Sequence, residues 1–463
     1  MGGASIRAPA RGNTRAARIA GAVFVAALAA TARGETYYVD AGFAEASDSS
    51  PGTAPDTPWR TLEHAMQAAA PGDTVWVKDG RYGGCSASVS GDSPEGPFPA
   101  FVPKRSGTAA ARIEFRAHPG HRPTLECFIG GGGKDYITWS GFRMDDRGVY
   151  ISVGPNPDRT AGLILENMDI RRRTDLHDPG SGNYYCIYLS GASGPIVRDN
   201  VLHDTNYVEH TDGNGVILYL TNDAVIEHNL IHGTHRGVLD KNSGERNIVR
   251  YNYIRDVTGS GLEINGFGCP SGEDGWCGHS QWHHNVVDGA ETGFRFGSGK
   301  TIHFQGVSAW NNTIHDVRRC MLGGTLDDFE FYNNICWTRS GGEQGFRTEG
   351  KADGFAVMDF NQWTHHDQRF IEGLYGSEQR VLGSLSAWRE ATGHDTHSVA
   401  SDPRFADAED GDFRLAEDSP SRGAGRVQGD PEGARVDHGA YEDGDETIGP
   451  RPTRSGAGDR GAP

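Results

Sequence analysis

Four side chains able to do chemistry stand at alternating positions of short runs that each begin with glycine. They lie two or four residues after Gly237, Gly261 or Gly293, and they are Lys241, Glu263, Asn265 and Arg295. Alternate residues of an extended strand share a face, so aligning the runs on their glycines gathers the four within about two strand spacings, or ~10 Å. An ammonium, a carboxylate and a guanidinium so placed can relay a proton and stabilise a developing negative charge.

The alignment defines two outward columns of side chains. One column holds Ile217, Leu239, Glu263 and Arg295, and the next holds Tyr219, Lys241, Asn265 and Gly297. His235 and Arg236 lie in the turn that enters these runs. Tyr188 and Tyr219 offer rings on which a sugar can stack.

A purely structural role for Lys241 and Glu263 is the alternative to this interpretation. An ion pair between Lys241 and Glu263 would make both residues structural. We expect such a ladder of ion pairs on another strand, in the column Arg198, Glu227 and Arg250.

We expect simpler roles for three other polar residues. We expect the isolated His228 and His284 to face solvent. Asp240 falls at an inward position of its run, which predicts a strand irregularity or a buried polar contact.

A repeated asparagine organises the chain around these runs. The pattern is an apolar residue, two mostly polar residues, Asn, any residue and an apolar residue, centred on Asn200, Asn229, Asn252, Asn285, Asn312 and Asn334. The steps between them are 29, 23, 33, 27 and 22 residues, which is typical of a solenoid of short strands. We expect an inward asparagine ladder at a tight turn, with each amide bonded to the next and the asparagine itself in left-handed geometry.

The period predicts an all-β fold, a right-handed parallel β-helix. A β-propeller would need about 40 residues per repeat, and a β-sandwich shows no fixed asparagine period. The N-terminal stretch predicts a cover for the first rung, because Trp59–Ala70 has apolar residues at helical spacing after Thr57-Pro58. A helix laid there would protect an otherwise unpaired edge.

Both ends of the chain resemble secreted bacterial pectate-lyase-like β-helix proteins. The opening residues that carry the resemblance are Tyr37–Val39, Pro51–Thr53, Pro58–Leu62, Ala70–Val75 and Asp79–Tyr82. The closing residues are Leu385–Trp388, Thr392–Asp395, Ser401–Pro403, Gly411–Leu415 and His438–Glu442. The resemblance implies a β-helix domain over residues 33–442, with an N-terminal cap at 36–82 and a closing segment at 385–442. Residues 443–463 are rich in Gly, Asp, Arg and Pro and predict a disordered tail.

Lys241-Asn-Ser, followed by Asn247 and Arg250-Tyr-Asn252, resembles the strand and turn of the chondroitinase B and alginate lyase group of β-helix lyases. In that group a lysine before a serine acts as the base, and an arginine one rung later assists it. The matching later run here is Leu262–Asn265, which has no arginine. The resemblance therefore covers Lys241 alone, with Arg295 one rung further on as the nearest substitute.

These residues favour a polysaccharide lyase that cleaves a uronate-containing polymer by β-elimination. Removing the C5 proton needs a neutralised carboxylate, a base, and a proton donor for the leaving oxygen. The expected catalytic residues are Lys241, Arg295, Glu263 and His235, and the expected sugar-binding residues are Tyr219, Asn265, Arg236, His210 and Tyr188.

Three other functions remain open. A C5 epimerase would use nearly the same site. A glycoside hydrolase needs two carboxylates about 5–9.5 Å apart, whereas Glu263 is the only carboxylate in the outward columns from Gly215 to Gly297. A noncatalytic glycan-binding surface protein would use the same groove without a reaction.

Two long insertions on neighbouring rungs carry oxygen ligands. Asp178 lies in the first insertion, and Glu209 and Asp212 lie in the second. Calcium held by them would neutralise the substrate carboxylate, although the sequence has no calcium-binding motif.

The net charge of the chain limits the partners that we expect, and its N-terminal stretch predicts the compartment. The chain has 463 residues and a net charge of −18, which argues against binding to nucleic acid or an anionic membrane and leaves an acidic polysaccharide as the expected partner. Arginines before residue 19, the apolar run Ile19–Ala30 and Ala30-Thr-Ala32 predict a secretory signal peptide over residues 1–32. We expect a secreted or periplasmic monomer without a membrane-inserted segment.

The chain has seven cysteines, an odd number, so at least one thiol must be free. Cys269 and Cys277 bracket a loop with no strand pattern, and we expect them to form a disulfide in an oxidising compartment. Cys186 lies in an apolar strand and is the expected buried thiol.

Overall fold

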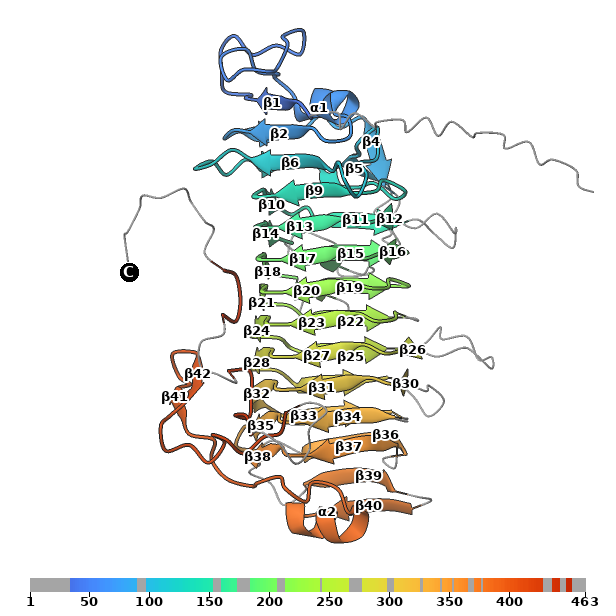
Figure 1. Ribbon diagram of the computed structural model, residues 1–463, viewed down its shortest axis with the longest axis vertical. Helices are drawn as coiled ribbons and strands as arrows, with labels where there is room; N and C mark the ends of the chain where they lie inside the picture. Colours follow the sequence, from blue (N-terminus) through green and yellow to red (C-terminus); the bar gives the residue numbers. More distant parts are fainter. Residues whose placement is uncertain are drawn as a thin grey trace, which may run out of the picture. The chain divides into compact units, whose positions relative to one another are not determined.

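The structure is a computed structural model, and the residues that it describes are 34–89, 97–152, 160–172, 184–205, 213–241, 244–265, 277–297, 304–324, 328–341, 344–351, 354–364, 370–375, 378–427, 435–441 and 447–451. The predicted signal peptide, residues 1–32, therefore lies outside the description. All described residues belong to one compact unit, Gly34–Pro463. In this unit short strands stack rung upon rung in a parallel β-helix (Figure 1), which confirms the predicted fold.

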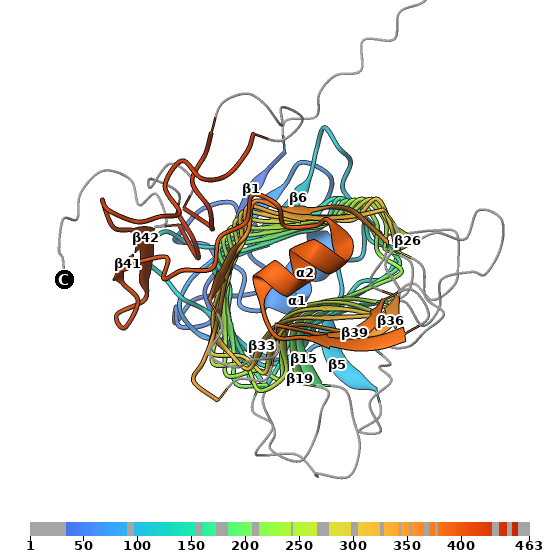
Figure 2. The same ribbon diagram turned by 90° about the horizontal axis from the view of Figure 1, so that it is seen from below.

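Three sheets form the sides of the coil, as Figure 2 shows along its axis. Sheet A consists, in order, of β1 (Thr36–Val39), β2 (Thr74–Val77), β6 (Ile113–Ala117), β9 (Ile137–Ser140), β13 (Ile164–Glu166), β17 (Ile196–Arg198), β20 (Val225–Glu227), β23 (Ile248–Arg250), β27 (Gln281–His283), β31 (Ser308–Trp310), β34 (Phe329–Tyr332) and β37 (Phe355–Asp359). Sheet B consists of β3 (Arg81–Tyr82), β7 (Thr124–Leu125), β10 (Arg143–Asp145), β14 (Asp169–Arg171), β18 (Val201–His203), β21 (Leu230–His232), β24 (Tyr253–Arg255), β28 (Val286–Asp288), β32 (Thr313–Val317), β35 (Ile335–Thr338) and β38 (Gln362–Thr364).

Sheet C carries the glycine-led runs. It consists of β4 (Ala87–Val89), β5 (Phe98–Phe101), β8 (Phe128–Ile129), β11 (Val149–Ser152), β15 (Tyr184–Ser190), β19 (Gly213–Tyr219), β22 (Arg236–Lys241), β25 (Ser260–Asn265), β29 (Thr292–Phe296), β33 (Arg319–Gly323), β36 (Gln344–Lys351), β39 (Ile371–Tyr375) and β40 (Glu378–Leu382). Small two-stranded pairs join β12 (Thr160–Ala161) to β16 (Ala192–Ser193), β26 (Cys277–Gly278) to β30 (Phe304–Gln305), and β41 (Phe405–Asp407) to β42 (Asp412–Leu415).

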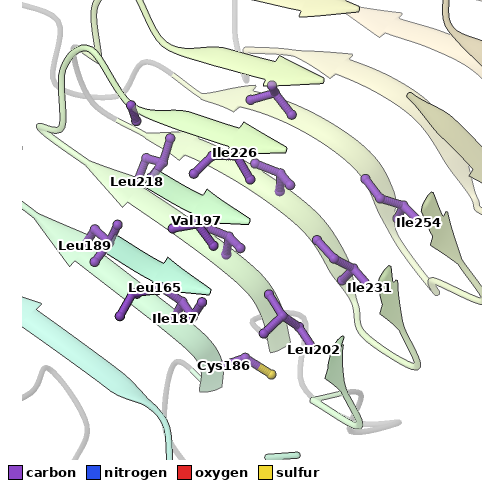
Figure 3. Packing of buried hydrophobic residues seen from close by; sticks show 14 of the residues in the cluster. Leu165, Cys186, Ile187, Leu189, Val197, Leu202, Leu218, Ile226, Ile231 and Ile254 are labelled. Atoms are coloured by element: carbon purple, nitrogen blue, oxygen red, sulfur yellow. The ribbon is translucent and has the colours of Figure 1, made fainter. Parts of the chain in front are cut away.

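The interior of the coil is apolar, and its side chains stack in register from rung to rung. Leu165, Val197 and Ile226 follow one another in sheet A, and Ile231 lies beside Ile254 in sheet B. All five are fully buried, and Figure 3 shows them lined up through successive rungs. Because each rung buries its apolar face mainly against its neighbours, the rungs are stable only as a stack.

The predicted asparagine ladder runs along the corner between sheets A and B. Its fully buried members among the described residues are Asn200, Asn229, Asn252, Asn285, Asn312, Asn334 and Asn361. Each Nδ2 donates to the Oδ1 of the next asparagine at 2.8–3.2 Å. That Oδ1 also accepts from the backbone N–H of the asparagine before it, so these buried amides are satisfied.

The prediction of left-handed geometry at the asparagine is wrong by one residue. The positive φ values, from 50° to 58°, occur at the residue before each ladder asparagine: Asp199, His228, Tyr251, His284, Asn311, Asn333 and Phe360. The chain therefore turns one residue earlier than predicted, and the asparagine is left with ordinary geometry and its amide pointing inward.

A short helix packs over the apolar interior at each end of the coil, as the projection in Figure 2 shows. Helix α1 (Leu62–Ala68) begins after Thr61, whose hydroxyl accepts from the N–H of His64 at 3.1 Å. It buries Leu62 and Met66 against the first rungs, as the predicted cap requires. The helix is shorter than the predicted Trp59–Ala70, because the capping side chain is that of Thr61.

Helix α2 (Leu385–Thr392) closes the other end, and its Trp388 shares the acceptor Asp395 with Asn361, the last described asparagine of the ladder. The carboxylate of Asp395 there accepts hydrogen bonds from Asn361, Trp363, Trp388 and Ser398. Burial raises the pKa of Asp395 to about 6, against the effect of these four donors. The ladder therefore ends on a buried acceptor.

The C-terminal segment returns along the corner that holds the ladder. The side-chain amide of Asn311 donates to the carbonyls of Asp437 and Gly439. Further along, Arg451 donates to both carboxylate oxygens of Asp199 at 2.9 and 2.7 Å. Residues 447–451 fall within the predicted disordered tail, and here they lie against the coil.

The expectation that His284 faces solvent is wrong. Its side chain is only 7% exposed, and its Nδ1 lies 2.8 Å from Nδ1 of His283. The rings of His228 and His284 both pack on Tyr251, with centroids 5.0 and 5.1 Å away. Burial lowers the pKa of His283 to about 3, so this histidine is neutral at physiological pH.

The expected column on the outside of sheet A holds ion pairs, but Arg198 pairs with Glu166 on the preceding rung rather than with Glu227. Arg198 and Arg116 both bind Glu166, and Arg250 binds Glu227, at 2.7–2.8 Å. Burial favours a raised pKa for Glu166, but the hydrogen bonds from Arg198 and Arg116 outweigh it and hold this pKa below its ordinary value.

The cysteines divide between one disulfide and buried thiols. Cys85 and Cys127, whose Cα atoms are 6.6 Å apart, form a disulfide that the sequence analysis did not identify. Cys186 is free and buried, as predicted, and Cys320 and Cys336 are buried thiols as well. The pairing of Cys269 with Cys277 stays a prediction, because Cys269 lies outside the described residues. No helix in the described part of the chain is both long enough and apolar enough to cross a membrane.

Candidate active site

The outward face of sheet C has the register that the glycine alignment predicted. The first column runs Ile217, Leu239, Glu263 and Arg295, and the second runs Tyr219, Lys241 and Asn265. The four residues singled out from sequence therefore stand on three consecutive strands, β22, β25 and β29.

Glu263 is the centre of a charged cluster on this face. Its side chain is only 1% exposed, and its Oε2 accepts from Nε of Arg236 at 2.9 Å. Its Oε1 lies 3.4 Å from Nδ2 of Asn265 and 3.9 Å from Nη1 of Arg295. The expected partner in an ion pair was Lys241, whereas the observed partners are Arg236 and Arg295. Because Arg236 is the first residue of β22 rather than a turn residue, its guanidinium can reach a carboxylate one rung away.

Lys241 ends β22 and is half-buried. In register it lies between Tyr219 and Asn265. No hydrogen bond or ion pair joins its ammonium to another residue that the structure describes. The amine is thus available for a substrate, while the neighbouring arginines are held in place by Glu263.

His235 lies in the turn just before β22. Its Nδ1 is 3.0 Å from the hydroxyl of Thr258, which belongs to the corresponding turn of the next rung. The other predicted loop residues, His210, Asp178, Glu209 and Asp212, lie outside the described residues. Among the residues that are described, no three His, Cys, Asp or Glu side chains gather as they would around a metal ion.

Tyrosines form a stack on the N-terminal side of the cluster. Tyr188 packs on Tyr150 with ring centroids 4.9 Å apart, and its ring lies 6.4 Å from that of Tyr219. Tyr150 and Tyr188 are only 4% and 9% exposed, whereas Tyr219 is half-buried. Of the two tyrosines predicted to stack on a sugar, Tyr219 therefore offers more ring surface.

Two further arginines extend the face beyond the predicted residues. Arg347 follows Arg295 in the first column, with Leu322 between them, and Arg319 pairs with Thr292, three residues before that column. The sequence contained the necessary pattern, because Gly345-Phe-Arg347 repeats the spacing of Gly293-Phe-Arg295. The predicted columns end at Gly297 and therefore do not include Arg347.

Arg319 lies near other arginines and a glutamate. Its guanidinium is 10% exposed and lies 3.4 Å from Glu291, which also binds Arg318 at 2.7 Å. Burial lowers the pKa of Arg319, and so do the charges of Arg318, Arg347 and Arg295, while Glu291 opposes them. Arg319 is therefore influenced both by neighbouring arginines and by Glu291.

Asp240 confirms the expected buried polar contact next to Lys241. The carboxyl group points into the coil, is 3% exposed, and accepts from Nδ2 of Asn247 at 2.8 Å. Its other oxygen has no hydrogen-bond partner among the described residues. Burial raises the pKa of Asp240 to about 7, although the bond from Asn247 lowers it.

We expect Asp240→Asn to stabilise the protein at alkaline pH. The folded pKa of about 7 exceeds the ordinary aspartate value, so the folded state binds the proton more tightly and loses stability as pH rises from about 4 to 7. The loss from this group amounts to roughly 4 kcal/mol at most. Urea unfolding at pH 5 and pH 8 should show a smaller pH dependence in Asp240→Asn, and an unchanged dependence would contradict the assignment.

Comparisons with known proteins support the architecture. No family model and no curated protein sequence matches the chain. Among solved structures, pectate lyase Pel9A matches with a TM-score of 0.53 and 15% identity, over 88% of this chain and 96% of that one. A rhamnogalacturonan lyase matches with a TM-score of 0.46 and 15% identity, over 81% and 90% of the two chains. The structure of XylC with xylose matches with a TM-score of 0.48 and 12% identity, over 80% and 87%. At these identities the comparison concerns the fold alone, and by its fold the chain is a parallel β-helix of the pectate-lyase-like kind.

Proposed function

We propose that the protein is a carbohydrate-active enzyme that cleaves a uronate-containing polysaccharide by β-elimination on the outward face of sheet C. The observation that carries this proposal is the position of Lys241. Its ammonium has no partner among the described residues and lies beside a cluster in which Glu263 fixes Arg236 and Arg295. A group that moves protons thus stands next to fixed positive charges, which is what the abstraction of a proton next to a carboxylate requires.

The reaction can be written with this chain's own residues. The arginines bind the sugar carboxylate and stabilise the negative charge that develops on it. Lys241 in its neutral form takes the C5 proton, the C–H electron pair forms the C4–C5 double bond, and the C4–O bond breaks. The proton carried by Lys241 then passes to the departing oxygen, so that the base is regenerated.

Calcium does not fit the described part of this face. It takes about six to eight oxygen ligands, whereas Glu263 is held between two arginines and is almost fully buried. The acidic residues suggested for calcium, Asp178, Glu209 and Asp212, lie outside the described residues. We therefore propose that Arg236 and Arg295 supply the neutralising charge.

A location outside the cytoplasm would suit the reaction that we propose. The disulfide between Cys85 and Cys127 supports a secreted or periplasmic location, because such bonds persist in oxidising compartments. An extracellular protein would also meet the acidic polysaccharides that this face would bind.

The test is to incubate the purified protein with alginate, pectate, chondroitin and hyaluronan, each with and without calcium. β-Elimination would give unsaturated sugar ends, which are detected by their ultraviolet absorbance. Reducing ends without unsaturation would indicate hydrolysis instead, and inversion at C5 without cleavage would indicate an epimerase. Binding without any reaction would identify a glycan-binding protein and contradict the proposal.

A further inference from the structure

Sheet C meets sheet B inside the coil through pairs of facing residues that repeat from rung to rung. On sheet C the position belongs to glycines whose neighbours in the chain pair in register, namely Gly215, Gly237, Gly261 and Gly293. On the next sheet B strand along the chain, the facing residues are Ile231, Ile254, Val287 and Ile314. A Cβ added to any of these glycines would lie 2.3–2.6 Å from a γ-carbon of the facing residue. The glycine is therefore required because the β-branched side chain opposite fills the space.

Cysteine replaces both members of the next pair. Cys320 takes the glycine position on β33, since the residue after it, Met321, pairs with Phe294. Cys336 takes the facing position on β35, where it pairs with Ile314. Cysteine has one γ-atom where isoleucine and valine have two, so Cys336 leaves room for a side chain at Cys320. The two cysteines thus face each other at a position where the four preceding rungs set glycine against isoleucine or valine.

The separation of the facing positions suits a disulfide. A C–C bond adds about 1.5 Å to the 2.3–2.6 Å between the added Cβ and the facing γ-carbon, so the two Cβ atoms of a facing pair lie within ~4 Å of each other. Disulfides join Cβ atoms that are about 3.5–4.5 Å apart. The thiols of Cys320 and Cys336 are hydrogen-bonded to each other. Both side chains are fully buried in the same apolar cluster.

Cys186 provides an internal comparison. It occupies the same glycine position on β15, but the facing residue on β18 is Leu202. Its thiol donates to the carbonyls of Ile170 and His203, at 3.4 and 3.7 Å. Cys186 is therefore a buried thiol at an equivalent position that has leucine opposite it instead of cysteine.

We propose that Cys320 and Cys336 form a second disulfide, which joins sheet C to sheet B through the interior of the coil. The oxidant is a disulfide of the oxidising compartment, carried by a protein or a small molecule. One cysteine gives up its proton and its thiolate attacks that disulfide, whose other sulfur leaves as a thiolate. The second cysteine, deprotonated in turn, attacks the mixed disulfide, so that the new S–S bond forms and the external sulfur leaves. The two cysteines lose two electrons, and the external disulfide takes up these electrons and both protons as two thiols.

The oxidation must precede the closing of the coil around the two sulfurs. Both cysteines are 0% exposed in the folded protein. Burial raises the pKa of the Cys336 thiol well above its ordinary value, and the hydrogen bond with Cys320 raises it further. Because the thiolate is the attacking species, folded protein that is still reduced should resist oxidation. The bond therefore belongs to the folding of the chain, and it does not act as a reversible switch.

The proposed bond would fasten the C-terminal end of the coil. The disulfide between Cys85 and Cys127 lies near the first rungs, whereas β33 and β35 lie near the last ones (Figure 1). The terminal rungs of a solenoid have a neighbour on one side only and open most readily. A covalent link near each end would protect the rungs between them. This inference does not depend on the proposed reaction, because the bond can be measured without a substrate.

The experiment maps the disulfides of the full chain produced in an oxidising compartment. The protein is unfolded in urea with N-ethylmaleimide, which blocks every free thiol, and is digested with trypsin without reductant. No lysine or arginine separates the two cysteines, so both lie in the peptide Cys320–Arg339. We expect this peptide to be unblocked and lighter by two hydrogens, and its two halves to stay joined after cleavage at Glu330. The Cys186 peptide should carry the block. Blocked Cys320 and Cys336, or a bond from either to another cysteine, would overturn the proposal.

Matched variants measure what the bond contributes. In Cys320→Ala the remaining Cys336 should become fully blocked. Dithiothreitol should lower the Tm of the wild type by about 3–6 °C more than that of Cys320→Ala/Cys336→Ala, in which the bond between Cys85 and Cys127 is left to reduce. Cys186→Ala removes a buried thiol and should respond to dithiothreitol as the wild type does. Equal shifts in the wild type and the double variant would contradict the proposal, and if the double variant does not fold, the peptide map of the wild type decides alone.

Discussion

Lys241→Ala is expected to lower the rate of unsaturated-end formation by about 10²- to 10⁴-fold, the usual contribution of a general base. The lysine lies at the outward end of β22, and none of the described residues bonds to its ammonium, so the fold should lose little. The free energy of unfolding should change by less than about 0.5 kcal/mol, as for most surface substitutions. Initial rates on the best substrate, together with urea unfolding, measure both effects.

Two further variants make the test specific. Lys241→Arg keeps a positive charge but cannot give up its proton, so it should be as inactive as alanine if Lys241 is the base. Activity in Lys241→Arg would mean that the lysine supplies only charge. Lys104→Ala removes an exposed lysine elsewhere and should retain the wild-type rate. If Lys241→Ala retains it as well, the site assignment is wrong, although the fold is unaffected.

Asn285→Ala is expected to cost about 2–6 kcal/mol of the free energy of unfolding, because it leaves two buried donors without an acceptor. The Oδ1 of Asn285 accepts from both N and Nδ2 of Asn252, at 3.2 and 2.9 Å. Its Nδ2 donates to Val249, His283 and Asn312. All of these groups are shut off from water in the middle of the coil, so solvent cannot replace the lost bonds.

Denaturant unfolding of Asn285→Ala and Asn265→Ala compares the ladder with the outer face. Asn265 is half-buried, and its one described side-chain bond is the 3.4 Å contact to Glu263. Its replacement should cost less than about 1 kcal/mol, the value for a typical single hydrogen bond. Equal stability of the two variants would show that the ladder contributes no more than a surface contact.

The part of the structure that repeats could be predicted from the sequence. The recurring asparagine gives the rung length, and the glycine at the start of each outer run gives the register of sheet C. Together they placed Leu239 beside Glu263 and Glu263 beside Arg295, as the pairing of β22, β25 and β29 confirms. A one-residue error in that alignment would have turned each of these side chains to the opposite face.

The features that break the repeat could not be predicted. The disulfide joins Cys85 to Cys127 across 42 residues, a separation that no local pattern reveals. The burial of His284 depends on stacking between rungs, to which an isolated histidine in the sequence gives no clue. Arg236 and Lys241 both lie on β22, one rung from the carboxylate of Glu263, and it is Arg236 that binds it. Which of the two does so depends on how far each side chain reaches, which the sequence does not show.

The asparagine ladder has a direction that bears on how such a chain can change in length over evolution. Every amide donates toward the C-terminal end and accepts from the rung before it, so each internal rung offers its neighbours the same pair of groups. The two ends differ: Asn200 accepts from the backbone of Met168, and Asp395 supplies the final acceptor. A whole rung could be duplicated or deleted between these ends without leaving an amide unsatisfied. Loss of either end residue would leave a buried hydrogen-bonding group without a partner. The number of rungs can therefore change during evolution far more freely than the residues that end the ladder.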